Sequence, residues 1–167
     1  ISLSKREADI ALRLTQPRYG RLRVRTLASM GHGVYAAHSY LEARGLPASV
    51  QALKSADFIV WGEAHQDIPI ARWLAGHVSN PNVALVANDI TTHIQAVRCG
   101  VGVGVLPAFL AAGDESLACL VPPDAMFERK LYLVIHEDVQ ASARVRLVAD
   151  FIADTVQASA ARFMGQV

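Results

Sequence analysis

Glu63, His65 and Asp67 bring two carboxylates and an imidazole close together in the sequence. Such groups can perform general acid-base catalysis when other elements hold a substrate against them. The sequence has no GxSxG motif for a nucleophilic serine, no GxxxxGKS or GxxxxGKT loop for phosphates, and no second polar cluster to complete a site. We therefore interpret residues 63–67 as a solvated loop and predict no catalytic residues and no enzymatic activity. A small α/β enzyme that uses these three side chains is an alternative.

Neither a metal site nor a dinucleotide site is indicated. The six histidines lack an HxH or HExxH spacing, and Cys99 and Cys119 are not a CxxC pair. We predict no metal and no cofactor, and the two cysteines suit a reducing compartment, the cytoplasm. Gly100, Gly102 and Gly104 follow a predicted helix instead of preceding one, so they do not match a dinucleotide-binding loop. They indicate close packing of a helix or close approach of a ligand.

The junction at Asn88 and Asp89 is a candidate binding site. A predicted strand, residues 83–87, leads into a helix whose first turn offers unpaired backbone N–H groups and the positive end of the helix dipole. These groups could receive the carboxylate of a small ligand. If Asp89 caps the helix, it occupies these donors and repels an anion; if it turns away, Asn88, Thr91 and Thr92 offer neutral hydrogen-bonding groups. Ordinary helix capping without any ligand is the simplest alternative.

Strands and helices alternate along the whole chain, which predicts an α/β fold. The segment from residue 83 to residue 106 indicates a parallel strand-helix-strand unit, residues 31–33 are expected to interrupt the chain, and Val145, Val148, Ile152 and Val156 form an apolar stripe on the last helix. Strands are expected at residues 8–14 (buried), 22–27, 34–37, 58–61, 83–87, 101–106, 117–121 and 131–135, and helices at 39–44, 47–54, 68–77, 90–100, 108–112 and 142–156.

Arg21, Arg23 and Arg25 alternate with apolar residues, as in a strand with one arginine-bearing face. A solvated outer face, or cover for a sheet edge, is the favoured interpretation over a role in binding a ligand or DNA.

The composition describes a globular chain with little net charge. It has 167 residues, 52% hydrophobic and 19% charged, and a formal net charge of +1, so it can bury a core but has no overall field to hold nucleic acid or an anionic membrane. Its longest uncharged run, residues 99–113, is shorter than the roughly 18 residues that a membrane span needs, so we expect no membrane partner. The chain begins without Met or a targeting segment, and we expect it to be part of a longer gene product.

The order of several segments resembles the effector-binding domain of LysR-type transcriptional regulators, over about residues 3–156. The matching segments are 7–13 (EADIALR), 33–41 (GVYAAHSYL), 45–47 (GLP), 53–59 (LKSADFI), 87–89 (AND), 96–107 (AVRCGVGVGVLP), 131–136 (LYLVIH), and 144–146 (RVR) leading to Asp150 and Phe151.

This resemblance implies a periplasmic-binding-protein-like fold of type II: two α/β lobes joined by two crossover strands, near residues 31–35 and 131–136. Residues 1–32 and 131–167 would form the first lobe, which is discontinuous and lacks the family's opening strand-helix units, and residues 33–130 the second. The implied function is that of a ligand-sensing regulatory domain with a small, carboxylated effector in the interlobe cleft. DNA would be bound only by a helix-turn-helix domain outside these residues.

The resemblance also implies partners and site residues. The parent protein would be a cytoplasmic homo-oligomer, a dimer or a tetramer. Effector contacts would come from three places: Leu14 and Thr15, the strand at Trp61, and the strand-to-helix junction at Asn88, Asp89, Ile90 and Thr91. A free-standing periplasmic solute-binding protein of the same fold is the alternative function. A helix-turn-helix in the upstream gene sequence would indicate the regulator, and an export signal there would indicate the solute-binding protein.

Overall fold

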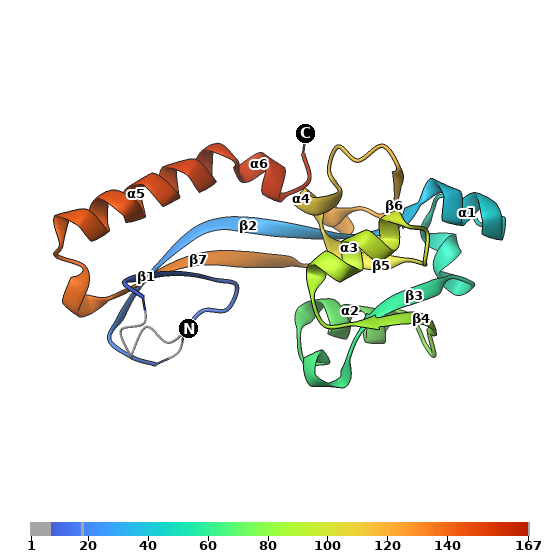
Figure 1. The fold of residues 1–167 in the computed structure, drawn as a ribbon, viewed down its shortest axis with the longest axis horizontal. Helices are drawn as coiled ribbons and strands as arrows, with labels where there is room; N and C mark the ends of the chain where they lie inside the picture. The colour runs from blue at the N-terminus through green and yellow to red at the C-terminus, as the bar shows by residue number, and fades with distance from the viewer. Residues whose placement is uncertain (1–7, 18, 167) are drawn as a thin grey trace.

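The structure is a computed structural model that describes residues 8–17 and 19–166. It is elongated, with two lobes bridged by the long strands β2 (Leu22–Ala37) and β7 (Glu128–His136) (Figure 1). We call the first lobe the part made of β1, the first half of β2, the second half of β7 and helix α5. The second lobe holds β3 to β6 and α1 to α4. The lobe boundaries at residues 32/33 and 130/131 remain a prediction, because β2 and β7 run through them unbroken.

The first lobe is an antiparallel sheet in the order β1-β7-β2, with β1 at Ile10–Arg13. Helix α5 (Ala143–Ala158) lies along this sheet (Figure 1), and its Val145 and Ala149 pack against Leu133 and Ile135 of β7. A short helix, α6 (Ala160–Phe163), follows α5.

Of two sequence predictions for the first lobe, one is wrong and the other is correct only in part. The strand expected to be buried, β1, is at best half-buried: Leu12 is 51% exposed, because β7 is its only partner among the described residues. Of the predicted stripe on α5, Val145 is buried and Ile152 packs against the same cluster, but Val148 is exposed. The buried residues of α5 are Val145, Ala149 and Ala153. Small alanines line this stripe, which lets the helix lie close to the sheet.

The sequence predicted an interruption at residues 31–33, but these residues lie inside β2. Here β2 changes partners: Gly31 is the last residue paired with β7, and from His32 onward β2 pairs with β5 (Gly104–Pro107). A Cβ atom on Gly33 would lie 2.7 Å from the Tyr35 ring. The glycines therefore provide room at a crowded crossing point of the two lobes.

The second lobe combines two small sheets. Strands β3 (Asp57–Trp61) and β4 (Asn82–Ala87) are parallel, and β5 and β6 (Leu117–Val121) pair antiparallel with the end of β2. The helices are α1 (His38–Arg44), α2 (Pro69–His77), α3 (Ile90–Arg98) and α4 (Ala108–Ala111), with short 3-10 helices at Val50–Lys54, Glu63–His65, Pro123–Ala125 and, beyond β7, Glu137–Val139. The largest buried cluster lies here and includes Val34, Phe58 and Val103.

The predicted strand-helix-strand unit forms, but its second strand begins later and does not return beside β4. After α3, Val103 bridges in parallel to Phe58 of β3, and β5 starts only at Gly104. A Cβ atom on Gly102 would lie 2.6 Å from the Asp57 carbonyl oxygen, and one on Gly104 would lie 2.6 Å from a Val97 methyl group of α3. Gly104 is thus required for close packing of the helix.

Within residues 8–17 and 19–166, no helix has both the length and the apolar character to cross a membrane.

Candidate functional site

The ends of β3 and β4 bring two of the predicted binding segments together. In this parallel pair Trp61 lies opposite Ala87, so the loops that leave both strands start side by side. The Gly62 N–H donates a hydrogen bond to Asn88 Oδ1 at 3.2 Å. A Cβ atom on Gly62 would lie 2.6 Å from that oxygen, so a larger residue at position 62 would displace the Asn88 side chain.

The first turn of α3 is capped by Asp89. Its Oδ1 accepts a hydrogen bond from the Thr92 N–H at 2.8 Å, and its Oδ2 accepts one from Thr92 Oγ1 at 2.7 Å. These bonds hold the pKa of the Asp89 carboxyl below its usual value, so the group is ionised at neutral pH. Of the two orientations left open by the sequence, the structure has the capping one. Asp89 therefore occupies donors that an anionic ligand would need and adds a negative charge beside them.

His93 and Trp61 form an aromatic pair behind this junction. Their ring centroids are 4.6 Å apart and their ring planes are nearly parallel. The centroid of the His65 ring lies 5.7 Å from that of Trp61. His93 is 1% exposed, and burial lowers the pKa of its imidazole. Because a carbonyl oxygen only accepts, the 3.2 Å contact of Nε2 with the Ala87 oxygen makes Nε2 the protonated nitrogen.

Three ring nitrogens of this group lack partners. His93 Nδ1, an acceptor in this tautomer, has no hydrogen bond among the described residues, and neither do Trp61 Nε1 and His65 Nδ1. Sequence reasoning assigned His65 to a solvated loop and gave His93 no role. The available signal was that His93 lies on the same helix face as Ile90, Ile94 and Val97, which the sequence correctly identified as apolar.

An apolar cavity of about 230 Å³ lies beside Trp61, between α2 and the β3-β4 sheet. Gln66 closes one side, and its Nε2 donates to the Trp61 carbonyl oxygen at 2.7 Å. A space of this size and lining can hold the carbon frame of a small ligand. The side chains that define it include Ile59, Ile70, Leu74 and Val105.

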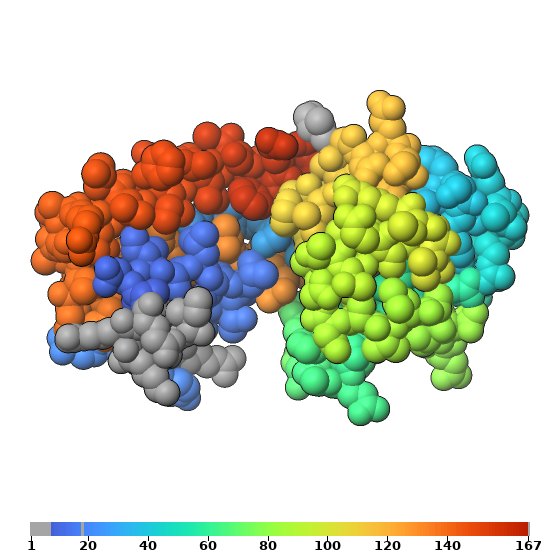
Figure 2. All heavy atoms as spheres, in the orientation of Figure 1, coloured from blue at the N-terminus to red at the C-terminus, as the bar shows by residue number. Residues whose placement is uncertain are grey.

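The predicted site residues are divided between the two lobes. Trp61, Asn88, Asp89, Ile90 and Thr91 gather in the second lobe, where the β4–α3 connection lies on the side that faces the first lobe (Figure 1). Leu14 and Thr15 line a separate hollow along β1. Figure 2 shows the surface hollowed between the two lobes.

The acidic segment predicted as a loop contains a single 3-10 turn, Glu63–His65. Glu63 and Asp67 are exposed, and Asp67 pairs with Arg72 at 3.5 Å. His65 differs from the expectation, because it packs against Trp61. Across the described part of the chain, no three His, Cys, Asp or Glu side chains are grouped so that they could hold a metal ion.

Comparisons with known proteins agree on one family. The LysR substrate binding domain family matches residues 2–157. A probable HTH-type transcriptional regulator, LtrA of Klebsiella pneumoniae, is 29% identical over 163 residues; the match covers 90% of this chain and 51% of LtrA, so the chain spans about half the length of that relative.

Solved structures show the same fold. The regulatory domain of CrgA, a LysR-type transcriptional regulator from Neisseria meningitidis, has a TM-score of 0.72 and 22% identity, over 92% of this chain and 78% of that one. The effector binding domain of QuiR, solved in complex with shikimate, has a TM-score of 0.67 and 14% identity, over 93% of this chain and 75% of that one.

Proposed function

The chain belongs to the LysR substrate-binding domain family, and from this premise we propose that it is the ligand-sensing domain of a LysR-type transcriptional regulator. Its relative LtrA is described as a probable HTH-type regulator, so in the parent protein DNA would be bound by a helix-turn-helix domain outside these residues. A dimeric or tetrameric, cytoplasmic parent protein is part of this proposal. Membership of this family favours the regulator over a free-standing periplasmic solute-binding protein.

The observation that carries the proposal is the junction of β3 and β4 at Asn88. Here a fixed polar side chain and the exposed Thr91 lie next to the Trp61 aromatic group and the apolar cavity beside it. The effector is proposed to place polar groups on Asn88 and Thr91 and its carbon frame toward Trp61.

The sequence predicts a carboxylated effector, and QuiR was solved with shikimate. Asp89 changes how a carboxylate would be held in this chain. Because its side chain already accepts the first-turn donor of α3, the ligand's carboxylate would be bound by the Asn88 side-chain amide and the Thr91 hydroxyl.

The proposed response to the effector is movement of one lobe relative to the other. A ligand that contacts both lobes favours the conformation in which both contacts are made. The lobes are bridged by β2 and β7, and β2 changes partners at residues 31–33. This crossing is the proposed hinge, through which closure would reorient the DNA-binding domains of the oligomer.

The test is a thermal-shift screen followed by calorimetry on the purified chain. The panel pairs carboxylates with neutral analogues: shikimate with its methyl ester, and benzoate with benzamide. For the compound that raises Tm most, we expect Asn88→Ala to weaken binding by about 1 kcal/mol, roughly fivefold in Kd, because one neutral hydrogen bond is lost. Gln95→Ala, on an exposed position of the same helix, should leave Kd unchanged. Equal affinity of wild type and Asn88→Ala would rule out the Asn88 site.

A further inference from the structure

Arg23 and Arg25 are exposed, in agreement with the solvated face or sheet-edge cover that the sequence favoured, and they lie beside α5. In the antiparallel register, Arg23 pairs with Ile135 and Arg25 pairs with Leu133. Residues directly opposite each other share a face of the sheet, and Leu133 and Ile135 are the residues that α5 covers. The two arginines therefore emerge between β2, the last strand of the first-lobe sheet among the described residues, and the start of α5.

A hollow of about 380 Å³ lies at this place, on the first lobe. Its walls are apolar near the sheet and basic toward solvent. The apolar part is formed by Val24, Leu133, Ile135 and Ala149, and the polar part by Arg23, Arg25, Gln140, Arg146 and Asp150. It shares no residue with the effector site proposed above.

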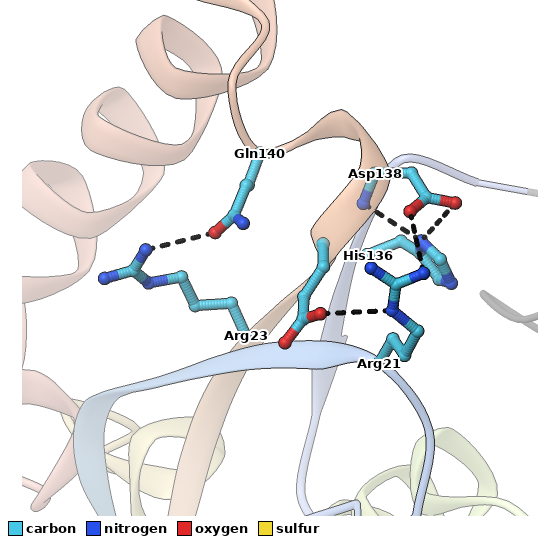
Figure 3. Close-up of polar contacts among 6 residues, drawn as sticks. Arg21, Arg23, His136, Asp138 and Gln140 are labelled. Carbon is cyan, nitrogen blue, oxygen red and sulfur yellow. Dashed lines mark hydrogen bonds and ion pairs between the residues drawn. The ribbon is translucent and has the colours of Figure 1, made fainter.

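Arg23 and Arg146 line the hollow and, among the described residues, lack the carboxylate partners that the neighbouring Arg21 has. Arg21 lies 3.3 Å from Glu137 and 3.7 Å from Asp138 (Figure 3). Arg23 instead turns toward the neutral Gln140 and donates to its Oε1 at 3.0 Å (Figure 3). The Arg146 guanidinium makes no hydrogen bond or ion pair with any described residue.

The hollow is lined by three guanidinium groups, those of Arg23, Arg25 and Arg146, and by one carboxylate, that of Asp150. Arg25 lies 3.6 Å from Asp150, and their side chains are 52% and 71% exposed, so this contact is weak. Two positive charges at the hollow thus remain uncompensated.

The start of α5 adds to this positive potential. The first turn of a helix is its positive end, and acidic residues there are stabilising. In α5 the first turn has no acidic residue and the N-cap Ser142 makes no side-chain hydrogen bond, while Arg144 and Arg146 lie close to it. Departures from a favourable local charge pattern are expected at functional sites.

We propose that this hollow binds a small dianion with a short apolar frame, a phosphate monoester or a dicarboxylate. The guanidinium forks of Arg23 and Arg146 can each donate two hydrogen bonds to such a group. Gln140 accepts from Arg23 through Oε1, which leaves its Nε2 free to donate to the ligand. The two uncompensated positive charges match a dianion, and Leu133 and Ile135 would contact its carbon atoms. This is a second ligand site, distinct from the effector junction.

The experiment is calorimetry of the whole chain with two dianions that carry one aromatic ring, phenyl phosphate and phthalate, and with neutral phenol. Both dianions should bind and phenol should not. Arg23→Gln and Arg146→Gln should each raise Kd about tenfold, because a charged hydrogen-bond donor is lost. Arg21→Gln, a matched change outside the hollow, should alter Kd less than twofold. Asp150→Asn should tighten binding several-fold, a gain that loss of folding could not produce.

The outcomes are separable. Tighter binding of phenyl phosphate identifies a phosphate monoester as the ligand class, and tighter binding of phthalate identifies a dicarboxylate. Equal binding of phenol, or equal weakening by Arg21→Gln and Arg23→Gln, would overturn the proposal. It would also be overturned if duplex DNA bound through these arginines and displaced phenyl phosphate, since the surface would then be a nucleic-acid site. Asn88→Ala should not change phenyl phosphate binding; a loss there would place the probe at the effector junction.

Discussion

His32 is a buried titratable residue near the crossing of the two lobes. It is 1% exposed, and its ring stacks on Phe127 with the centroids 4.6 Å apart. Burial, helped by the positive charge of Arg129, lowers its pKa from 6.5 to about 4. The folded chain therefore keeps this imidazole neutral over a pH range in which the unfolded chain protonates it.

We predict a loss of stability as the pH falls from about 6.5 to about 4. In this window the unfolded state binds more protons than the folded state, so stability rises with pH and is fully present above 6.5. The shift corresponds to about 3 kcal/mol for His32, and His93, whose pKa is also lowered by burial, adds to it. Urea unfolding at pH 7.5, 5.5 and 4.5 measures the effect.

His32→Gln should flatten this pH dependence, because the replacement does not titrate. His38→Gln is the matched control, since His38 is exposed at the start of α1. An unchanged pH slope in His32→Gln would show that His32 is not the titrating group.

Gly104 and Gly76 allow a paired test of packing. A Cβ atom on Gly104 would lie 2.6 Å from Val97, which is fully buried, whereas a Cβ atom on Gly76 in α2 would have no neighbour within 4 Å. We predict that Gly104→Ala destabilises the chain by about 1–3 kcal/mol through overpacking. Gly76→Ala should stabilise it by about 0.5–1 kcal/mol, because alanine restricts the backbone of the unfolded chain more than glycine does. The midpoints of urea unfolding measure both effects. If both substitutions stabilised the chain, the close contact of α3 with β5 would be contradicted.

At the scale of elements, α5 and β1 leave apolar surface uncovered. Leu147 and Phe151 of α5 are 73% and 69% exposed, and Leu12 of β1 is 51% exposed. Among the described residues β1 pairs only with β7, so it is the edge strand of the sheet that these residues form. Exposed strand edges and apolar patches promote association.

We therefore predict that this 167-residue chain self-associates. Phe151→Lys and Leu12→Lys should each lower the average mass measured by light scattering at high protein concentration, because a charge opposes burial of these surfaces. Thr155→Lys adds the same charge at an exposed position of α5 and should have a smaller effect. A monomeric wild-type chain at all concentrations would contradict the prediction.

At the scale of the whole molecule, the net charge of +1 gives the chain no overall positive field to hold nucleic acid. We predict no sequence-specific DNA binding by these residues alone. Arg21, Arg23 and Arg25 allow weak retention that salt removes. A gel-shift assay with competitor DNA at moderate salt measures this, and a complex that survives those conditions would contradict the prediction.

Many elements could be predicted from the sequence because their signals act over a few residues. Gly45 ends α1 in the left-handed conformation, with φ of 61°. Asp89 caps α3 through Thr92, three residues away. The alternation of strands and helices, and the order of the matched segments, indicated the family and the type of fold. The Asn88 junction could also be predicted as a candidate site, because it lies where a predicted strand meets a predicted helix.

The tertiary structure decided what depends on residues far apart in the chain. Gly31 and Gly33 lie inside a strand because β7 and β5 supply partners on either side of the crossing. Arg23 reaches Gln140, 117 positions away, so no local pattern could show that this arginine faces a hollow. The sequence by itself determined the local elements and the family, because those follow from short-range hydrogen bonds and apolar periodicity. The burial of His93 and the uncompensated charge beside α5 follow from long-range packing, which only the folded chain specifies.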